Sequence, residues 1–264
     1  MRGLSAFLEL NRALSRQLTP DHVHEANVFG AYRKIGTIVL SHPKVRRVAD
    51  VGAGKSWQFP PYYKTWYGLE LIGIDIDPVE MDANPVLDRR IVCDVVEGIP
   101  LPDESVDLVM AHSGVEHFED NERFLKNAFR ILRPGGYFLA QFPGRYASFA
   151  IANRLLPGWL ASKVLYLSMG ETDVLGFKAH YDRTNCKAFR KLATAVGFSE
   201  VYHLPGYFGA KYFESLGPLF VIPYLYDSIC YCLGARELAS YNLFLLQKPG
   251  HEADGEPLWL YAWK

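Results

Sequence analysis

Two apolar segments, each followed by a characteristic turn, constrain the fold of this chain more than any other feature. Val48–Val51 runs directly into Gly52-Ala53-Gly54, and Leu71–Ile74 ends in Asp75. In a doubly wound α/β sheet, the carboxyl ends of the first strands form the ligand crevice. Glycines let the backbone approach a bound nucleoside closely, and a carboxylate that accepts from ribose hydroxyls contributes roughly 1.5–3 kcal/mol per hydrogen bond. The two segments therefore predict an α/β sheet that binds a nucleoside.

Two other kinds of glycine loop fit this sequence less well. A dinucleotide fingerprint requires a third glycine for close helix–strand packing, and that position is Trp57. Gly54-Lys55-Ser56 resembles the end of a phosphate-binding loop, but Ala49 stands where that loop begins with glycine. Such a loop also leads directly into a helix, whereas Pro60-Pro61 cannot lie inside one. A nucleotide-hydrolysing enzyme that uses Gly54-Lys55-Ser56 stays an alternative.

Segments further along the chain continue the pattern at regular spacing. Ile91–Val95 is an expected third strand with Asp94 at its end, and Val106–Ala111 is an expected fourth strand. A helix over 121–132 then leads through a proline–glycine turn into a fifth strand. Over about residues 46–142, this ordered set resembles the small-molecule class I S-adenosylmethionine-dependent methyltransferases related to the ubiquinone and menaquinone biosynthesis enzymes. The resemblance implies a Rossmann-like α/β fold with a seven-stranded sheet of order 3-2-1-4-5-7-6, whose last strand is antiparallel.

The resemblance also implies which residues bind the cofactor S-adenosyl-L-methionine. The positions that match the family's motifs are Asp50, Gly52, Ala53, Gly54, Asp75, Ile76, Asp94, Val95 and Ser113. Asp50 is expected to face the methionine amino group. Asp75 would accept from the ribose hydroxyls, and Ile76 would flank the adenine. Asp94 would accept from the adenine amino group, with Val95 beside the ring.

Two positions near these motifs need a separate interpretation. Lys55-Ser56 replaces the usual residues after the second motif glycine, and a lysine is unfavourable near a sulfonium unless its side chain points outward. Asp77 lies beyond the end of the second strand, beside Pro78. We predict that Asp77 caps a turn or a helix and does not bind ribose.

No motif specifies a general base, but two histidines are candidates for a catalytic role. His117 follows the fourth strand, near the expected position of the transferred methyl group, and His180 precedes a helix expected from Cys186. Either imidazole could accept a proton from a hydroxyl at neutral pH. Alternatively, His117 braces the helix that follows it and His180 supports a loop. Glu116 and Tyr181 are weaker candidates.

The sequence predicts no metal site. His112, Glu116 and His117 are close in sequence, but one Glu and Asp120 fall short of the converging carboxylates that metal-dependent methyltransferases of catechol type require. His22 and His24 are two residues apart, do not share a helical face, and are expected at the surface.

The composition is that of a single globular enzyme. A chain of 264 residues is long enough to bury a large core, and a net charge of −1 gives no general electrostatic reason to bind nucleic acid. The four cysteines form no C-x-x-C pair, and the N-terminus lacks the apolar core of a secretion signal. We therefore expect a cytoplasmic protein without a disulfide framework.

The pattern divides the chain into three parts. Residues 1–43 are expected to form a helical cap, and residues 249–264 a tail. The methyltransferase domain over 44–248 carries apolar inserts at about 144–176 and 206–236. The remaining expected elements are cap helices over 4–18 and from Pro20 to about Ser41, lid helices over 147–156 and 160–169, a helix over 186–196 capped by Gly197, and strands over 198–203 and 241–247.

The second insert contains the longest apolar stretch of the chain. Leu216–Leu233 is at the short end for crossing a bilayer, which needs roughly 20 apolar residues. Asp227 near its centre would cost about 2.5–3.5 kcal/mol there. Three interpretations of residues 212–235 stay open: packing on the domain, a homodimer contact, and a surface that rests peripherally on membrane lipid.

Together, these observations predict methyl transfer from S-adenosylmethionine to a small or lipid-linked acceptor by in-line displacement. In such a reaction, positioning supplies roughly 7–11 kcal/mol. The sequence does not specify whether the acceptor atom is O, N or C. An alternative from another class is a non-catalytic S-adenosylmethionine-binding regulatory or partner protein. The complete set of acids, Asp50, Asp75 and Asp94, argues against it.

Overall fold

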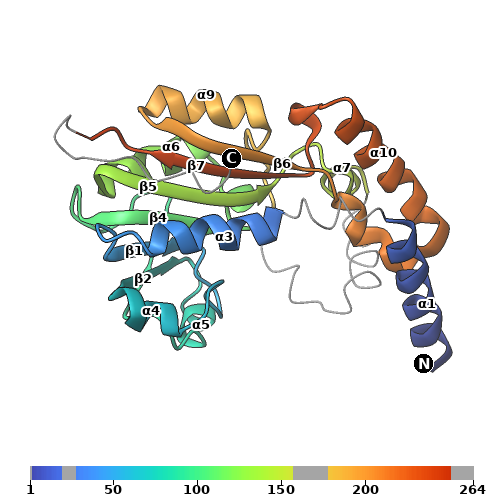
Figure 1. Cartoon of the computed structure of the whole chain (residues 1–264), viewed down its shortest axis with the longest axis horizontal. Coiled ribbons are helices and arrows are strands. Elements are labelled where there is room, and N and C mark those ends of the chain that lie inside the picture. The colour runs from blue at the N-terminus through green and yellow to red at the C-terminus, as the bar shows by residue number, and fades with distance from the viewer. Residues whose placement is uncertain (1, 20–27, 157–177, 251–264) are drawn as a thin grey trace.

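A single sheet organises the molecule. The computed structural model describes residues 2–19, 28–156 and 178–250 (Figure 1). The sheet has seven strands in the order β3-β2-β1-β4-β5-β7-β6. The first five strands pair in parallel, and β7 pairs antiparallel with both β5 and β6. The predicted strand order and the antiparallel last strand are confirmed.

The strands lie close to their predicted positions. They are β1 (Arg47–Val51), β2 (Glu70–Asp75), β3 (Arg89–Val92), β4 (Val106–His112), β5 (Leu132–Pro143), β6 (Ser199–Gly206) and β7 (Tyr241–Gln247). The third strand ends before Asp94, earlier than predicted, because the Asp94 carbonyl accepts from the backbone N–H of Glu97 and Gly98 in a turn. Strand β6 extends to Gly206, past its predicted end, because it continues to pair with β7 as far as Tyr241.

Most of the helices that the sequence predicts within the described residues are present, and the structure adds others that were not predicted, including the two helices of the insert before β7. They are α1 (Arg2–Leu18), α3 (Val28–Leu40), α4 (Tyr62–Tyr67), α5 (Pro78–Asp82), α6 (Asn121–Ile131), α7 (Ser148–Leu155), α9 (Cys186–Val196) and α10 (Val221–Cys232), with 3-10 helices η1 (Val115–His117), η3 (Gly209–Phe220) and η4 (Arg236–Leu238). Gly197 ends α9 with a φ of 115°, as its predicted cap. The sequence analysis missed α4, which begins directly after Pro60-Pro61, where proline is tolerated.

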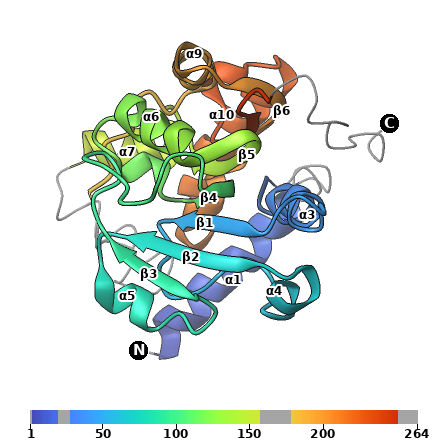
Figure 2. The same cartoon turned by 90° about the vertical axis from the view of Figure 1, so that its left-hand side faces the viewer.

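Each face of the sheet packs against its own helices. On one face, Ala49 and Phe138 of the strands share a core with Phe124 of α6 and Phe189 of α9. On the other, the core is shared with α3, including the buried Tyr32. Figure 2 shows α3 and α6 on opposite sides of the sheet. Alternate side chains of each strand point to opposite faces, so these helices cover the sheet on both sides.

The insert between β6 and β7 packs with the N-terminal helix at one side of the sheet (Figure 1). Asn11 and Ser15 of α1 donate to the carbonyls of Ser215 and Glu214 in η3, at 3.3 and 3.0 Å. Asp227 of α10 is buried and accepts from the Ser240 hydroxyl at 2.6 Å and from the Ala210 N–H at 2.8 Å. Since these bonds satisfy the carboxylate, they support packing on the domain.

A second, exposed face of these helices is apolar. Its largest exposed side chains include Leu10, Leu14 and Leu18 of α1 and Ile222, Leu225 and Ile229 of α10. Their spacing of three and four residues places each set along one helix face. Within the described residues, no helix is long and apolar enough to cross a membrane.

Several predictions concern segments outside the described residues. The start of the second cap helix, the lid helix over 160–169 and most of the C-terminal tail belong to this group, as do His22 and His24.

Candidate functional site

The glycine turn after β1 forms the floor of the candidate site. Gly52 and Gly54 have φ values of 70° and 46°, a region that favours glycine. The Gly52 N–H donates to the Ile74 carbonyl of β2 at 2.8 Å. A Cβ atom built on Gly52 would make ordinary van der Waals contact with the Cα atom of Gly114 at 3.8 Å, and Gly52 itself is exposed. The backbone conformation therefore favours glycine at both positions, and the exposed Gly52 is accessible to a ligand.

Asp75 connects this turn to the end of β2. Its Oδ2 atom accepts from the Gly54 N–H at 3.0 Å, and its Oδ1 atom accepts from the Asp77 N–H at 3.0 Å. Each carboxylate oxygen has a further lone pair. The half-buried carboxylate can therefore hold the turn in place and still accept from a pair of ligand hydroxyls.

Asn84 also stabilises the glycine turn. Its side chain is fully buried, and Nδ2 donates to the carbonyls of Ala53 at 3.2 Å and Gly54 at 3.3 Å. The sequence analysis missed this residue. Its one local signal is the following Pro85, which marks a turn but does not reveal a contact with residues about thirty positions earlier.

The residues after the glycine turn do not form a phosphate-binding loop. Lys55 points outward and pairs with Glu80 of α5 at 3.2 Å, which meets the condition set by the sequence analysis. Between Gly54 and Pro61 the chain forms turns and bends, and α4 begins only at Tyr62, so no helix follows directly on the glycine turn. Trp57 is buried against Phe59, with ring centroids 5.2 Å apart, and packs into the core.

Asp77 is a helix cap, as predicted. Its side chain accepts from the N–H groups of Val79 at 2.8 Å and Glu80 at 3.3 Å, at the start of α5. The carboxylate is thus occupied by the helix terminus, which leaves Asp75 as the acid at the end of β2.

Asp50 is the most perturbed carboxyl group of the glycine-turn region. It is 7% exposed, and burial, together with the nearby charge of Asp75, raises its pKa to about 7. Its charge also contributes to the raised pKa of Tyr32 in α3. Since burial without a compensating cation disfavours the carboxylate, a cationic ligand group beside Asp50 would stabilise its ionised form.

The proposed adenine-binding positions lie at the ends of β2 and β3. Asp94 is exposed, and its Oδ1 atom accepts from the Val96 N–H at 2.9 Å. Val95 is buried in the core beneath it. Ile76 is 56% exposed, beside Asp75. Ile76, which stands between Asp75 and Asp77 in the sequence, provides an apolar surface for a ring that forms hydrogen bonds at its edges.

Ser113, the residue after β4, is held in an unusual conformation. Its φ is 53°, a region that costs a non-glycine residue roughly 1–2 kcal/mol. Its N–H donates to the Gln141 carbonyl at 2.8 Å, and its hydroxyl donates to the Gln141 side-chain carbonyl at 3.4 Å. The buried Nε2 atom of Gln141 has no hydrogen-bond partner. The strained backbone of Ser113 and the unpaired Nε2 donor of Gln141 are features that are common at functional sites.

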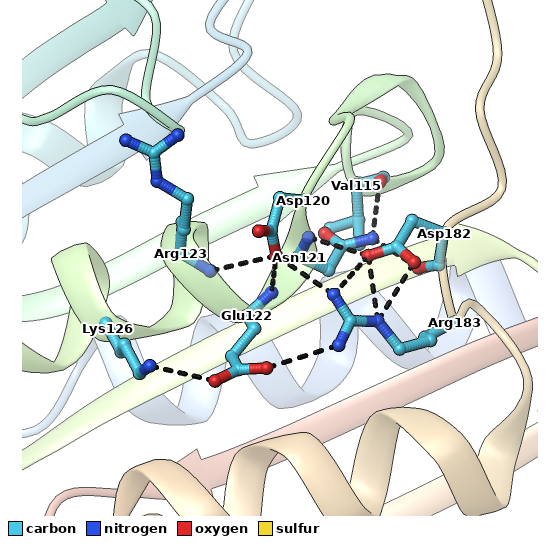
Figure 3. A network of polar contacts seen from close by, with 8 residues as sticks. All are labelled: Val115, Asp120, Asn121, Glu122, Arg123, Lys126, Asp182 and Arg183. Carbon is cyan, nitrogen blue, oxygen red and sulfur yellow. Dashed lines mark hydrogen bonds and ion pairs between the residues drawn. The ribbon is translucent and has the colours of Figure 1, made fainter.

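A polar network fixes the segment that carries both candidate histidines (Figure 3). Asn121 at the start of α6 donates from Nδ2 to the carbonyls of Val115 at 3.2 Å and Asp182 at 2.6 Å. Arg183 joins Asp182 to Asp120 at 2.9 Å, and to Glu122 at 3.3 Å. The network ties the loop after residue 177 to the η1 turn, so segments far apart in sequence meet behind the site.

The two histidines have different surroundings within this network. The Nδ1 atom of His117 lies 3.2 Å from the Lys178 carbonyl, which can only accept, so Nδ1 carries the proton. Burial lowers the pKa of His117, and its Nε2 atom lies 3.8 Å from Oε1 of the buried Glu116. His180 instead pairs through Nε2 with the exposed Glu119 at 3.4 Å.

Glu116 is a buried acid that the sequence analysis ranked below the histidines. It is 5% exposed, its Oε2 atom has no hydrogen-bond partner, and burial raises its pKa to about 8. Its backbone carbonyl accepts from the N–H groups of His180 at 2.8 Å and Tyr181 at 3.0 Å. A Glu directly before a His in sequence carries no signal for such burial.

His112 is an aromatic contact residue in this structure. Its ring packs 4.9 Å from Tyr32 and 5.7 Å from Phe29, and burial lowers its pKa to about 4. Among the residues that the structure describes, no three His, Cys, Asp or Glu side chains gather as metal ligands.

The described residues fit an adenosyl sulfonium with an amino-acid tail. Gly52 of the glycine turn is exposed, Asp75 has further lone pairs, and no described cation lies beside Asp50 to stabilise its charge. The arrangement therefore offers acceptors for a pair of hydroxyl groups at Asp75 and a carboxyl group for a cation at Asp50.

Comparison with known proteins agrees with this geometry. Residues 49–140 match the family described as "Methyltransferase domain". A probable S-adenosylmethionine-dependent methyltransferase of Mycolicibacterium smegmatis is 40% identical over 110 residues, which are 38% of this chain and 39% of that protein. The human mitochondrial ubiquinone biosynthesis O-methyltransferase is 35% identical over 102 residues, 34% of this chain and 27% of that protein. The chain thus spans about two fifths or less of these relatives.

The fold similarity extends further than the sequence similarity. The crystal structure of a proposed sarcosine dimethylglycine methyltransferase from Galdieria sulphuraria superimposes with a TM-score of 0.54 and covers 86% of each chain. The two sequences are 15% identical, so this similarity concerns the fold alone.

Proposed function

We propose that this chain is a class I S-adenosylmethionine-dependent methyltransferase and that it transfers the methyl group of S-adenosylmethionine to a small-molecule acceptor. The observation that carries the proposal is the position of Asp75 and its hydrogen bond to the glycine turn. Its carboxylate fixes the glycine turn through the Gly54 N–H and stays able to accept from the ribose. A family match over residues 49–140 supports the same conclusion.

The cofactor contacts are assigned by position along the carboxyl ends of the strands. Gly52, Ala53 and Gly54 approach the amino-acid part of the cofactor. Asp50 faces its amino group, and Ser113 presents backbone to the methionine. The remaining proposed contacts follow β2 and β3: Asp75 with the ribose, Ile76 and Val95 with the adenine ring, and Asp94 with the adenine amino group.

When bound, the cofactor supplies an electrophilic methyl group, and the protein has to align an acceptor with it. We assign the role of general base to His117. Its Nδ1–H is held by the Lys178 carbonyl, so Nε2, which lies 3.8 Å from Oε1 of Glu116, is the ring nitrogen that would take a proton from an acceptor hydroxyl. His180, whose ring engages Glu119, is the second candidate and is more consistent with support of the loop.

Titration calorimetry with S-adenosylhomocysteine tests the assignment of the cofactor site. We expect Asp75→Asn to weaken binding at least tenfold, because the amide replaces a charged acceptor that contributes roughly 1.5–3 kcal/mol per bond. Asp103→Asn is the matched control: this aspartate is 74% exposed and precedes β4, at the opposite edge of the sheet. The Asp103→Asn variant should bind S-adenosylhomocysteine as tightly as the wild type does.

Thermal melting of each variant separates loss of binding from loss of folding. The proposal fails if wild-type protein does not bind S-adenosylhomocysteine, or if folded Asp75→Asn protein binds it as tightly as wild type does. Binding without turnover across a broad acceptor panel would favour the non-catalytic alternative. Magnesium-dependent ATP binding that Lys55→Ala abolishes would favour the nucleotide-hydrolysing alternative.

We further infer a cytoplasmic location. A finer hypothesis is that the acceptor is lipid-linked. Residues 212–235 would then form either a peripheral membrane contact or a homodimer contact. The free cysteines among the described residues support a reducing compartment. The exposed apolar face of α1 and α10 supports contact with a lipid surface or a second copy of the chain. Sedimentation with and without vesicles distinguishes the two.

A further inference from the structure

A second cavity lies between the N-terminal helix and the insert before β7. It has a volume of about 410 Å³, within the usual range for small-molecule sites. It is lined by Arg12, Arg16, Phe29, Lys211, Tyr212, Glu214 and Tyr241. The lining thus combines aromatic rings with several charged side chains, from elements far apart in the sequence.

The aromatic part of the cavity adjoins the proposed site of methyl transfer. Phe29 packs against Tyr241, with ring centroids 5.1 Å apart, and against His112 at 5.7 Å. His112 ends β4 directly before Ser113, and Tyr241 pairs with Pro143 at the end of β5. Since both strands end at this edge of the sheet, the aromatic part of the cavity lies at the same edge as the residues proposed to bind the cofactor.

The charged part of the cavity is predominantly cationic. Arg12, Arg16 and Lys211 line it with one carboxylate, Glu214, which pairs with Arg16 at 3.3 Å. The Lys211 ammonium lies 6.0 Å from the centre of the Phe29 ring and forms no salt bridge with any residue that the structure describes. Among the described residues of the lining, three side chains are therefore cationic and one is anionic, and they lie beside aromatic rings.

We propose that this cavity binds the acceptor of the methyl group, and that the acceptor is a phosphate ester with an aromatic or other apolar body. This inference rests on the proposed methyl transfer. Phosphate carries −1.5 to −2 charges at neutral pH, and arginine and lysine are its usual partners. The rings of Phe29, Tyr212 and Tyr241 contact the apolar body, while Lys211 and the two arginines hold the phosphate.

Calorimetry with phenyl phosphate and with phenol tests the charge requirement. We expect wild-type protein to bind phenyl phosphate at least tenfold more tightly than phenol. Lys211→Glu should remove most of this difference. Lys191→Glu, at an exposed position of α9 on the other side of the sheet, is the matched control and should leave both affinities unchanged. Equal binding of the two probes, or equal binding of phenyl phosphate by wild type and Lys211→Glu, overturns the proposal.

The phosphate could belong to a soluble metabolite or to a lipid headgroup, and cosedimentation distinguishes these sources. Retention on phosphatidylcholine vesicles that contain phosphatidic acid, with no retention on pure phosphatidylcholine and loss in Lys211→Glu, assigns the lipid source. Binding of phenyl phosphate without vesicle retention assigns the soluble source. Both outcomes support a phosphate site.

Titration of the same samples with S-adenosylhomocysteine separates this inference from the proposed function. We expect Lys211→Glu to bind S-adenosylhomocysteine as wild type does, because Lys211 is not assigned to the cofactor. If the cofactor product binds and phenyl phosphate shows no Lys211-dependent binding, only the acceptor inference fails. If S-adenosylhomocysteine does not bind to wild type, the proposed function itself fails.

Discussion

Replacing Asp50 by asparagine should make the folded protein more stable at pH 8, although Asp50 is a proposed cofactor contact. The carboxyl group is 7% exposed, and its pKa is about 7 in the folded protein against an ordinary 3.8. Between these two pH values, the folded state binds more protons than the unfolded state. Stability therefore falls as the pH rises from about 4 to 7, and the full cost of the buried charge is present above that range.

The size of this effect follows from the difference between the two pKa values. A difference of about 3 units corresponds to roughly 4 kcal/mol at 1.36 kcal/mol per unit, which is an upper limit on the cost of ionised Asp50. Since asparagine is still a buried polar group, we expect Asp50→Asn to gain about 2–4 kcal/mol at pH 8. The gain should shrink by about 2–3 kcal/mol at pH 5, where the folded wild-type protein is already protonated at Asp50.

Urea unfolding at both pH values measures these gains. Asp107→Asn is a control that should change stability in the opposite direction. Asp107 is also 7% exposed, but hydrogen bonds and an ion pair stabilise its buried charge. It accepts from the N–H groups of Arg46 at 2.9 Å and Arg47 at 2.8 Å, and pairs with Arg133 at 2.7 Å. We expect this variant to lose about 1–3 kcal/mol.

The reasoning is refuted if Asp50→Asn is no more stable than wild type at pH 8, or if its gain is the same at pH 5. The same variant should bind S-adenosylmethionine more weakly, since it lacks the charge that faces the amino group. An acid kept at a cost to stability is typical of a functional site.

Three further predictions concern the glycine turn and the candidate base. Gly52→Ala should lose about 1–2 kcal/mol of stability from its φ of 70° alone, whereas Gly98→Ala, with no atom within 4 Å and no positive φ, should be nearly neutral in urea unfolding; equal losses would contradict this. Asn84→Ala removes two donors to the turn, so it should lose about 1–3 kcal/mol and weaken S-adenosylhomocysteine binding in calorimetry; unchanged affinity would argue against its supporting role. Nitrogen NMR of His117 should show a proton on Nδ1, toward Lys178, and a pKa below 6.5; an Nε2 proton would exclude it as the base in this geometry.

Local patterns in the sequence were sufficient to predict the sheet and most of its helices. The seventh strand lies at its predicted bounds, and α9 with its Gly197 cap does as well. Asp77 was predicted to cap a helix and does so at α5. Each of these features depends on residues within a few positions of one another, such as a periodic apolar face or a capping side chain.

Other features depend on contacts between distant segments, which no local pattern records. The direction of Lys55 is set by Glu80, and the glycine turn is supported by Asn84. Helix α4 was missed because Pro60-Pro61 was taken as a break and not as the start of a helix. The loop behind the site is held by Asn121 through its bond to the carbonyl of Asp182.

The sequence by itself therefore determined where the strands lie and which acids follow them, and its resemblance to a known family supplied the order of the strands. Strand periodicity and glycine turns are short-range properties, and the carboxyl ends of parallel strands necessarily meet at one edge. Tertiary structure alone decided the state of each site group: the raised pKa of Asp50, the tautomer of His117 and the cationic cavity at Lys211. These properties depend on burial and on charges brought together from distant segments, because electrostatic energies change with the surroundings of a group and not with its neighbours in sequence.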